Sequence, residues 1–256
     1  MKFRTLSRIN YFKRARHHGG HGIHSPFLFH LITAVIEDKL RYPEYETFRI
    51  LNLSVLHIRS NHPGIRFFKI NHPRRLSLTK SDTIYDEVDL PMSFGKLVFR
   101  LIREFQPATL IHFGPSLGIN LAIMAIARTN DQVPIYQIAD DTEYKLFNDE
   151  LLKGSGISNI TFLPVNSELP VYHPEFMVIN YPDNPEKTEN IMMQYRDNPG
   201  GNGVVIIRGI HQSLQMEVVW KKLIAHQSVR VSLDLFEIGI ALFRKGLQKE
   251  DFIYRF

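Results

Sequence analysis

The hydrophobic pattern divides the chain into an irregular first third and a regular remainder. Between Phe94 and Phe105, apolar side chains recur at intervals of three and four residues, which predicts an amphipathic helix. Beyond it, short apolar runs alternate with longer helical patterns. These runs, rich in β-branched and aromatic residues, are expected to be strands, and they are TLIHF, PIYQIA, NITFLPV, EFMVIN and GVVIIR.

This alternation of strands and helices is typical of the α/β class. The strands are continuously apolar, as expected for a parallel sheet that helices cover on both faces. Near the end of the chain, VRVSLDLF and EIGIALFRK follow one another with no room for a helical crossover. We therefore expect a mostly parallel sheet with a C-terminal antiparallel hairpin.

The first 90 residues are harder to interpret. Ser25 followed by Pro26 predicts a capped helix start, and the helix should run to about Asp38. A second helix is expected around residues 45–58, whereas residues 59–90 support no assignment. We interpret residues 1–90 as a basic, helical N-terminal extension and residues 91–256 as the main domain.

The excess positive charge lies entirely in the N-terminal extension. The formal charge is +5, yet residues 1–36 contain six basic residues and no acid, so the remainder carries −1. Such an arm suits nucleic acid or an anionic membrane, but its interleaved apolar residues favour a solvated arm that packs partly on the protein. We therefore expect no membrane partner, and nucleic acid is ranked last among the partners.

Other compositional features narrow the class further. The chain has no cysteine, which excludes disulfides, thiolate metal sites and a cysteine nucleophile. No apolar run reaches the roughly 18 residues that a membrane-spanning helix needs, and no cleavable leader pattern is recognised. A cytoplasmic location is expected.

The most informative segment is LIHFGPSLGIN, residues 110–120, which predicts a strand, a glycine turn and a helix. Gly114 and Gly118 permit backbone angles closed to other residues and allow a ligand to approach the main chain. The end of the first strand is also where α/β sheets bind ligands. An ordinary tight turn is the alternative interpretation.

The wider sequence resembles a known family. FGKLVFRLIREFQPATLIHFGPSLGIN resembles the start of the domain in class I S-adenosylmethionine-dependent methyltransferases of the catechol O-methyltransferase type, and SLDLFEIGIALFRK resembles their closing hairpin. HGIHSPFLFHLI resembles an N-terminal segment of methyltransferase-like proteins from Bacteroidetes. The resemblance implies a Rossmann-like, doubly wound sheet with S-adenosylmethionine across the strand ends.

The resemblance also implies which residues would contact the cofactor. The glycine turn would contact its methionine part, acids after the second strand its ribose, and a polar residue after the third strand its adenine. Helix capping is the alternative role for the pair of acids after the second strand. The candidate cofactor residues are His112, Gly114, Pro115, Ser116, Gly118, Asp140, Asp141, Asn166 and Asn180.

Several of these positions depart from the family pattern. His112 replaces the acid before the glycine turn, which removes a charge that would hold the cofactor's amino group. Asn180 and Arg208 replace metal-binding carboxylates of metal-dependent members, and an arginine repels a cation, so we expect no metal site. His211, just past the fifth strand, is the candidate general base, with a capping or packing role as the alternative.

Two hypotheses of different classes remain. The first is a metal-independent methyltransferase that uses S-adenosylmethionine to methylate an oxygen of a small molecule. The second is a catalytically degenerate relative that keeps the fold as a binding or scaffolding module. Nucleic-acid methylation ranks third, and a homodimer is left open. The substrate cannot be predicted from the sequence.

Overall fold

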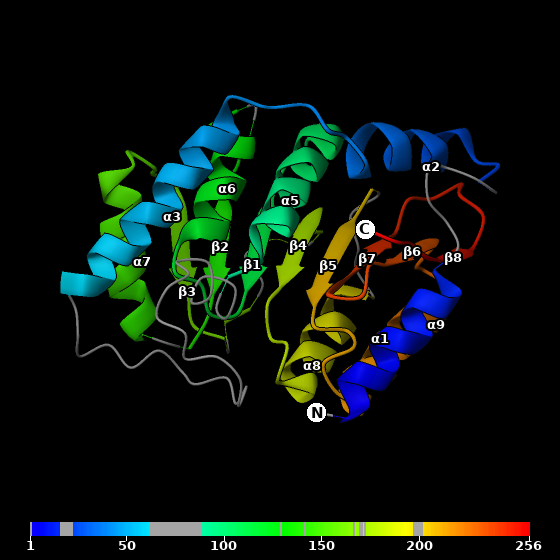
Figure 1. Ribbon diagram of the computed structural model, residues 1–256. Coiled ribbons are helices and arrows are strands. Elements are labelled where there is room, and N and C mark those ends of the chain that lie inside the picture. The colour runs from blue at the N-terminus through cyan, green and yellow to red at the C-terminus, as the bar shows by residue number, and fades with distance from the viewer. Residues whose placement is uncertain are drawn as a thin grey trace.

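The computed structural model describes residues 2–15, 23–61, 89–128, 130–140, 142–165, 167–168, 171, 173–196 and 202–256. Its centre is an eight-stranded sheet with the strand order β3-β2-β1-β4-β5-β7-β6-β8 (Figure 1). The strands are β1 (Leu110–Phe113), β2 (Ile135–Ile138), β3 (Ile160–Leu163), β4 (Phe176–Ile179), β5 (Val204–Arg208), β6 (Val231–Asp234), β7 (Ile238–Leu242) and β8 (Glu250–Ile253).

The sheet is mostly parallel, as the sequence predicted. Five neighbouring strands pair in parallel, in the order β3, β2, β1, β4 and β5 across the sheet. Strand β7 is antiparallel to both β5 and β6. The predicted α/β fold and C-terminal hairpin are therefore confirmed. The last strand, β8, pairs in parallel with β6 and was not predicted.

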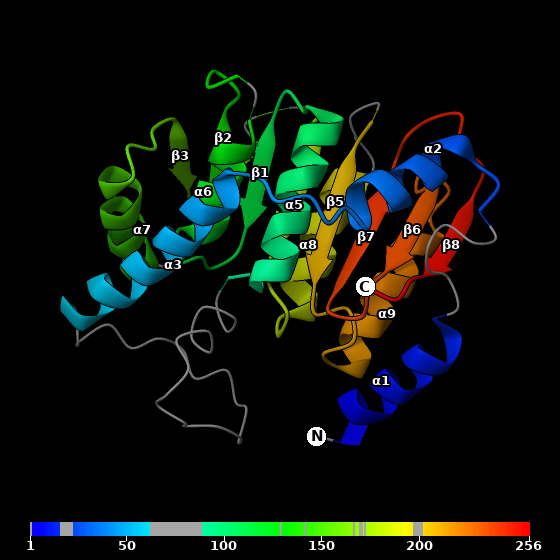
Figure 2. The ribbon, with the colours of Figure 1, turned by 45° about the horizontal axis from the view of Figure 1, so that its top comes forward.

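Helices cover both faces of the sheet (Figures 1 and 2). One core holds residues of α2, η1, α3, α5, α6 and α7, and the other holds residues of α8 and α9. The helical segments are α1 (Lys2–Arg14), α2 (Pro26–His30), the π-helix η1 (Leu31–Ile36), α3 (Glu44–Asn61), α5 (Met92–Phe105), α6 (Ile119–Ala127), α7 (Thr142–Gly154), α8 (Pro185–Arg196) and α9 (Leu214–Ala225).

The N-terminal extension packs on the main domain. Ser25 caps α2 by accepting a hydrogen bond from the Leu28 N–H at 3.4 Å, and the predicted helix continues as the π-helical turn η1. Helix α3 also forms where expected and packs against α6 and α7. Buried residues of η1 and α3 thus share one core with the sheet. The domain boundary near residue 90 stays a prediction.

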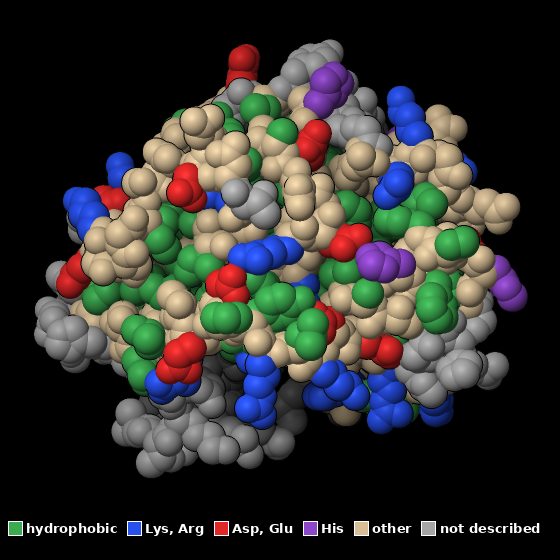
Figure 3. All heavy atoms as spheres, turned by 90° about the horizontal axis from the view of Figure 1, so that it is seen from above, with side chains coloured by type: hydrophobic (Ala, Val, Ile, Leu, Met, Phe, Trp, Pro, Cys, Tyr) green, Lys and Arg blue, Asp and Glu red, His purple; other side chains and the backbone are tan. Residues whose placement is uncertain are grey.

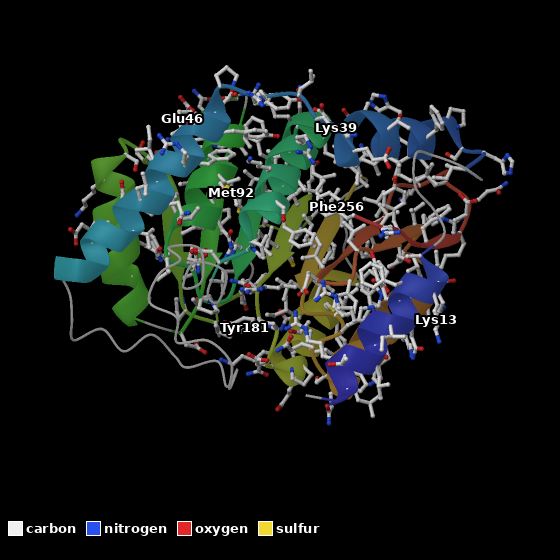
Figure 4. The ribbon with its side chains drawn as sticks, in the orientation of Figure 1. Lys13, Lys39, Glu46, Met92, Tyr181 and Phe256 are labelled. Carbon is white, nitrogen blue, oxygen red and sulfur yellow. The ribbon has the colours of Figure 1, made fainter. Side chains whose placement is uncertain are left out.

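The arm at the N-terminus is a helix held on the protein by one face. Arg4 pairs with Glu237 at 2.6 Å, Ser7 donates to Glu217 at 2.9 Å, and the buried Tyr11 donates its hydroxyl to the Tyr254 carbonyl. Figure 4 shows Lys13 near the C-terminal end of this helix. Figure 3 shows another face of the molecule, on which several Lys and Arg side chains lie along the lower edge. The arm is therefore packed on one side, as predicted.

The second core contains the chain's single tryptophan, Trp220 of α9. A Cβ atom on Gly239 of β7 would lie 2.8 Å from its ring, so the indole packs directly on the strand backbone. Within the described ranges, no helix is both long and apolar enough to span a membrane.

Candidate functional site

The glycine turn lies at the carboxyl ends of β1 and β4, where the strand order reverses. Gly114 has a φ of +105°, and a Cβ there would lie 2.4 Å from the Asn180 carbonyl oxygen. Gly118 has a φ of +95° and lies against Asn148. Gln137 of β2 donates to the Gly114 carbonyl at 2.6 Å. The turn therefore requires glycine for both conformation and space.

A carboxylate that the sequence did not point to sits inside this turn. Asp89 is fully buried. One of its oxygens accepts the Ser116 hydroxyl at 2.6 Å, and the other accepts the Leu117 N–H at 2.9 Å. The Ser116 oxygen in turn accepts the Gly118 N–H at 3.0 Å. Asp89 thus fixes the turn from within.

The surroundings of Asp89 oppose its charge. Burial raises its pKa to about 6, although the hydrogen bonds from Ser116, Leu117 and Asn120 pull the pKa back down. These hydrogen bonds therefore stabilise the charged form of Asp89 in a site that water does not reach.

His112 lies two residues before the turn, on β1. It is fully buried, and its Nε2 lies 3.3 Å from the Asn120 side-chain nitrogen. Burial lowers its pKa to about 4, against the opposing influence of the neighbouring Gln137. Its Nδ1 makes no hydrogen bond of ordinary geometry in the described part of the chain, and Gln137 is the neighbour close enough to act on it. The family that the sequence resembles has an acid at this position, and this chain has a neutral imidazole there instead.

Asn180 and Arg208 extend the polar groups along the sheet edge. The Asn180 amide donates to the Pro115 carbonyl at 2.7 Å, and Arg208 donates to the Asn180 side-chain oxygen at 3.0 Å. The Arg208 charge also lowers the pKa of both Asp89 and His112, which places the guanidinium near the turn. This fixed cation opposes a divalent metal.

A metal ion would need several acidic or imidazole side chains that converge on one point. Among the described residues, no group of three or more His, Asp or Glu side chains is arranged to hold an ion. The expected metal independence stays a prediction.

On the other side of the turn, Asp140 follows β2 and pairs with Lys187 of α8 at 2.5 Å. The Lys187 ammonium also lies 5.4 Å from the centre of the Tyr181 ring, and Figure 4 shows Tyr181 at this end of the sheet. Since β1 lies between β2 and β4, the ion pair joins elements that flank the turn. The other ribose and adenine candidates, Asp141 and Asn166, lie outside the described residues.

His211 lies farther along the same edge, in a cluster of its own. Its Nδ1 is 2.7 Å from Glu217, its Nε2 is 2.8 Å from Asp234, and its ring stacks on Phe236. Burial alone would lower its pKa, but hydrogen bonds and charge from the two carboxylates outweigh burial and raise the pKa. A base needs an unprotonated nitrogen, and this arrangement favours the imidazolium. The role of His211 stays a prediction that this geometry does not favour.

Solved structures share this arrangement of strands and helices. A methyltransferase of Podospora anserina bound to S-adenosylhomocysteine aligns over 81% of this chain and 98% of its own, with 10% identity and a TM-score of 0.55. An O-methyltransferase of Streptomyces achromogenes in complex with S-adenosylmethionine covers 77% and 98%, with 12% identity and a TM-score of 0.51. The chain shares the fold of these methyltransferases. An O-methyltransferase of Bacillus cereus also aligns, over 80% and 92%, with 8% identity and a TM-score of 0.50.

No protein-family model and no curated protein sequence matches the chain. The likeness to these methyltransferases is therefore one of structure alone, and at this identity a shared fold does not carry the activity with it.

The structure brings together part of the predicted cofactor set. His112, the glycine turn and Asn180 form one connected group, and Asp140 lies beside it. Sequence reasoning missed Asp89, Asn120, Gln137 and Lys187. Only Asp89 had a visible sequence feature, because it is an acid shortly before the helix that begins at Met92, and that feature is too common to have identified it.

Proposed function

We propose that the chain binds S-adenosylmethionine and transfers its methyl group to an oxygen of a small molecule without a divalent metal. The observation that carries the proposal is the glycine turn at the point where the strand order reverses. There the Gly114 and Gly118 backbone is open to positive φ and free of Cβ atoms. Ligands bind α/β sheets at this point.

The residues around the turn fit the cofactor in part. The side chain of Asp140, half exposed at the end of β2, suits the two hydroxyls of a ribose. It would have to exchange Lys187 for those hydroxyls. The neutral His112 offers no negative charge to an ammonium group, so this part of the fit is poorer.

When bound, the cofactor would supply the electrophilic methyl group. The chain would position the acceptor oxygen in line with that group and stabilise its negative charge once its proton has passed to water. Arg208, close to the turn and always charged, is the residue suited to the second task. A cation fixed in the protein would then do there what a metal ion does in metal-dependent enzymes.

Isothermal titration of S-adenosylhomocysteine into the purified protein tests the cofactor claim. We expect binding that Gly118→Arg abolishes, because the new side chain would meet Asn148 and Leu151. The matched control, Gly156→Arg, also lies at positive φ but has open space around it and should leave binding unchanged. Absence of binding to the unaltered protein, with no shift in melting temperature, would contradict the proposal.

A second function is favoured by a specific observation. The candidate base His211 is bound to carboxylates on both ring nitrogens, and the acid before the turn is replaced by a neutral group. A catalytically degenerate module that binds the cofactor without transferring methyl groups would have these same two features. Binding of S-adenosylmethionine without turnover across a panel of phenols, carboxylates and hydroxylamines would favour this alternative.

A further inference from the structure

The first turn of α6 is arranged to receive an anion. The Leu117 and Asn120 N–H groups and the Ser116 hydroxyl all point to one place, and Gly118 is the N-cap of the helix. Free N–H groups at a helix N-terminus bind carboxylates and phosphates readily. In this chain the place is already taken by a carboxylate of the chain itself.

The occupant, Asp89, is held there with little help from opposite charge. In the part of the chain that the structure describes, no lysine or arginine forms an ion pair with it, and Arg208 acts only from a distance. Its negative charge is offset by the turn's own donors, at 2.6 Å from Ser116, 2.9 Å from Leu117 and a longer 3.5 Å from Asn120. Those donors are then no longer available to a ligand.

Buried groups beside Asp89 also lack hydrogen bonds of ordinary geometry. The buried Nδ1 atom of His112 and the buried Oε1 atom of Gln137 make no hydrogen bond of ordinary geometry in the described part. The two residues are register partners on β1 and β2, and Gln137 is close enough to raise the pKa of His112 against the effect of burial. Buried polar atoms without partners are uncommon in folded proteins. The polar groups under the turn are therefore poorly satisfied in the structure with Asp89 in place.

We propose that Asp89 is an internal competitor for the carboxylate of an α-amino acid ligand at this turn. The inference rests on the proposed function, because the amino acid end of S-adenosylmethionine is the ligand in question. With Asp89 in place, a second carboxylate would meet both filled donors and a like charge. The protein then binds its cofactor only in the fraction of molecules in which Asp89 has left the turn, which weakens the apparent affinity.

Removing the internal carboxylate should therefore strengthen ligand binding. We expect Asp89→Ala to lower the dissociation constant of S-adenosylhomocysteine about tenfold or more, measured by isothermal titration. Asp251→Asn is the matched control, because Asp251 accepts the Ser232 hydroxyl at 2.5 Å at the far edge of the sheet. A dissociation constant for Asp89→Ala that is equal to or larger than that of the unaltered protein would overturn the proposal.

A second measurement separates this inference from the proposed function. Sodium acetate, titrated against chloride at constant ionic strength, should raise the melting temperature of Asp89→Ala but not that of the unaltered protein. Asp89→Asn keeps the space filled and should not respond, and it serves as a second variant if the alanine protein does not fold. If no protein binds S-adenosylhomocysteine but acetate still stabilises Asp89→Ala, the proposed function fails and the internal competitor stands. Equal acetate responses in all three proteins would overturn it.

Discussion

At the scale of single residues, the glycine turn was predictable and its occupant was not. Gly114 and Gly118 stand out in the sequence because a pair of glycines between a strand and a helix is typical of a ligand-binding turn. Asp89 could not be singled out, since nothing local distinguishes a buried carboxylate from a solvated one. Its partners are Ser116 and the main chain nearly 30 residues away, and only the folded chain brings them together.

The close approach at Gly114 predicts a large effect of a single methyl group. We expect Gly114→Ala to lower the free energy of unfolding by about 1 to 3 kcal/mol, from positive φ and from the clash with the Asn180 carbonyl. Urea unfolding measures the change. Gly154→Ala is the control, because a Cβ there meets nothing within 4 Å. Equal stabilities for the two variants would show that the turn tolerates a side chain.

At the scale of elements, periodicity located the helices and strands but not the contacts that orient them. Helix α5 and the strands β1 to β5 form where their apolar patterns predicted. The docking of α1 was harder to foresee, because it depends on Glu217, Glu237 and the Tyr254 carbonyl, all more than 200 residues away. No local pattern encodes such partners.

The cluster that joins α1, α9 and β6 predicts a pH dependence. The folded state raises the pKa of His211, so its contribution to stability is complete below the unfolded pKa of about 6.5 and is lost as the pH rises through the higher folded value. The free energy of unfolding should therefore fall more steeply above pH 6.5 in the unaltered protein than in His211→Gln. Groups such as Asp89 titrate in both proteins and cancel in the difference. Parallel pH profiles would contradict this assignment.

At the scale of the whole molecule, the order of elements along the chain predicted the parallel sheet and its hairpin. It did not predict β8, the strand at the far edge of the sheet. The segment EDFIYRF is short and charged, so no strand was predicted there. In the fold it forms β8 and carries the buried Phe252 and Tyr254. Tyr254 also contacts the N-terminal helix and Glu37, which joins the two ends of the chain.

This closing strand predicts that the chain tolerates little C-terminal shortening. A protein ending at Lys249 should lose more than about 3 kcal/mol of stability, because two buried aromatic side chains are removed and the edge of β6 is exposed. Light scattering should show aggregation on heating. Removal of residues 255–256 alone should cost far less, since Phe256 is partly exposed. Equal behaviour of the two truncations would mean that β8 contributes little.

The place of Trp220 determines what optical experiments on this protein can report. Its indole is buried against Gly239 on the face of α8 and α9, whereas the glycine turn, Asp89 and His112 lie toward α5 and α6. Its fluorescence emission should therefore change when the whole protein unfolds and hardly change when a ligand binds at the turn. A fluorescence titration that shows no change would say nothing about binding, and a new reporter would have to be introduced on the α6 side.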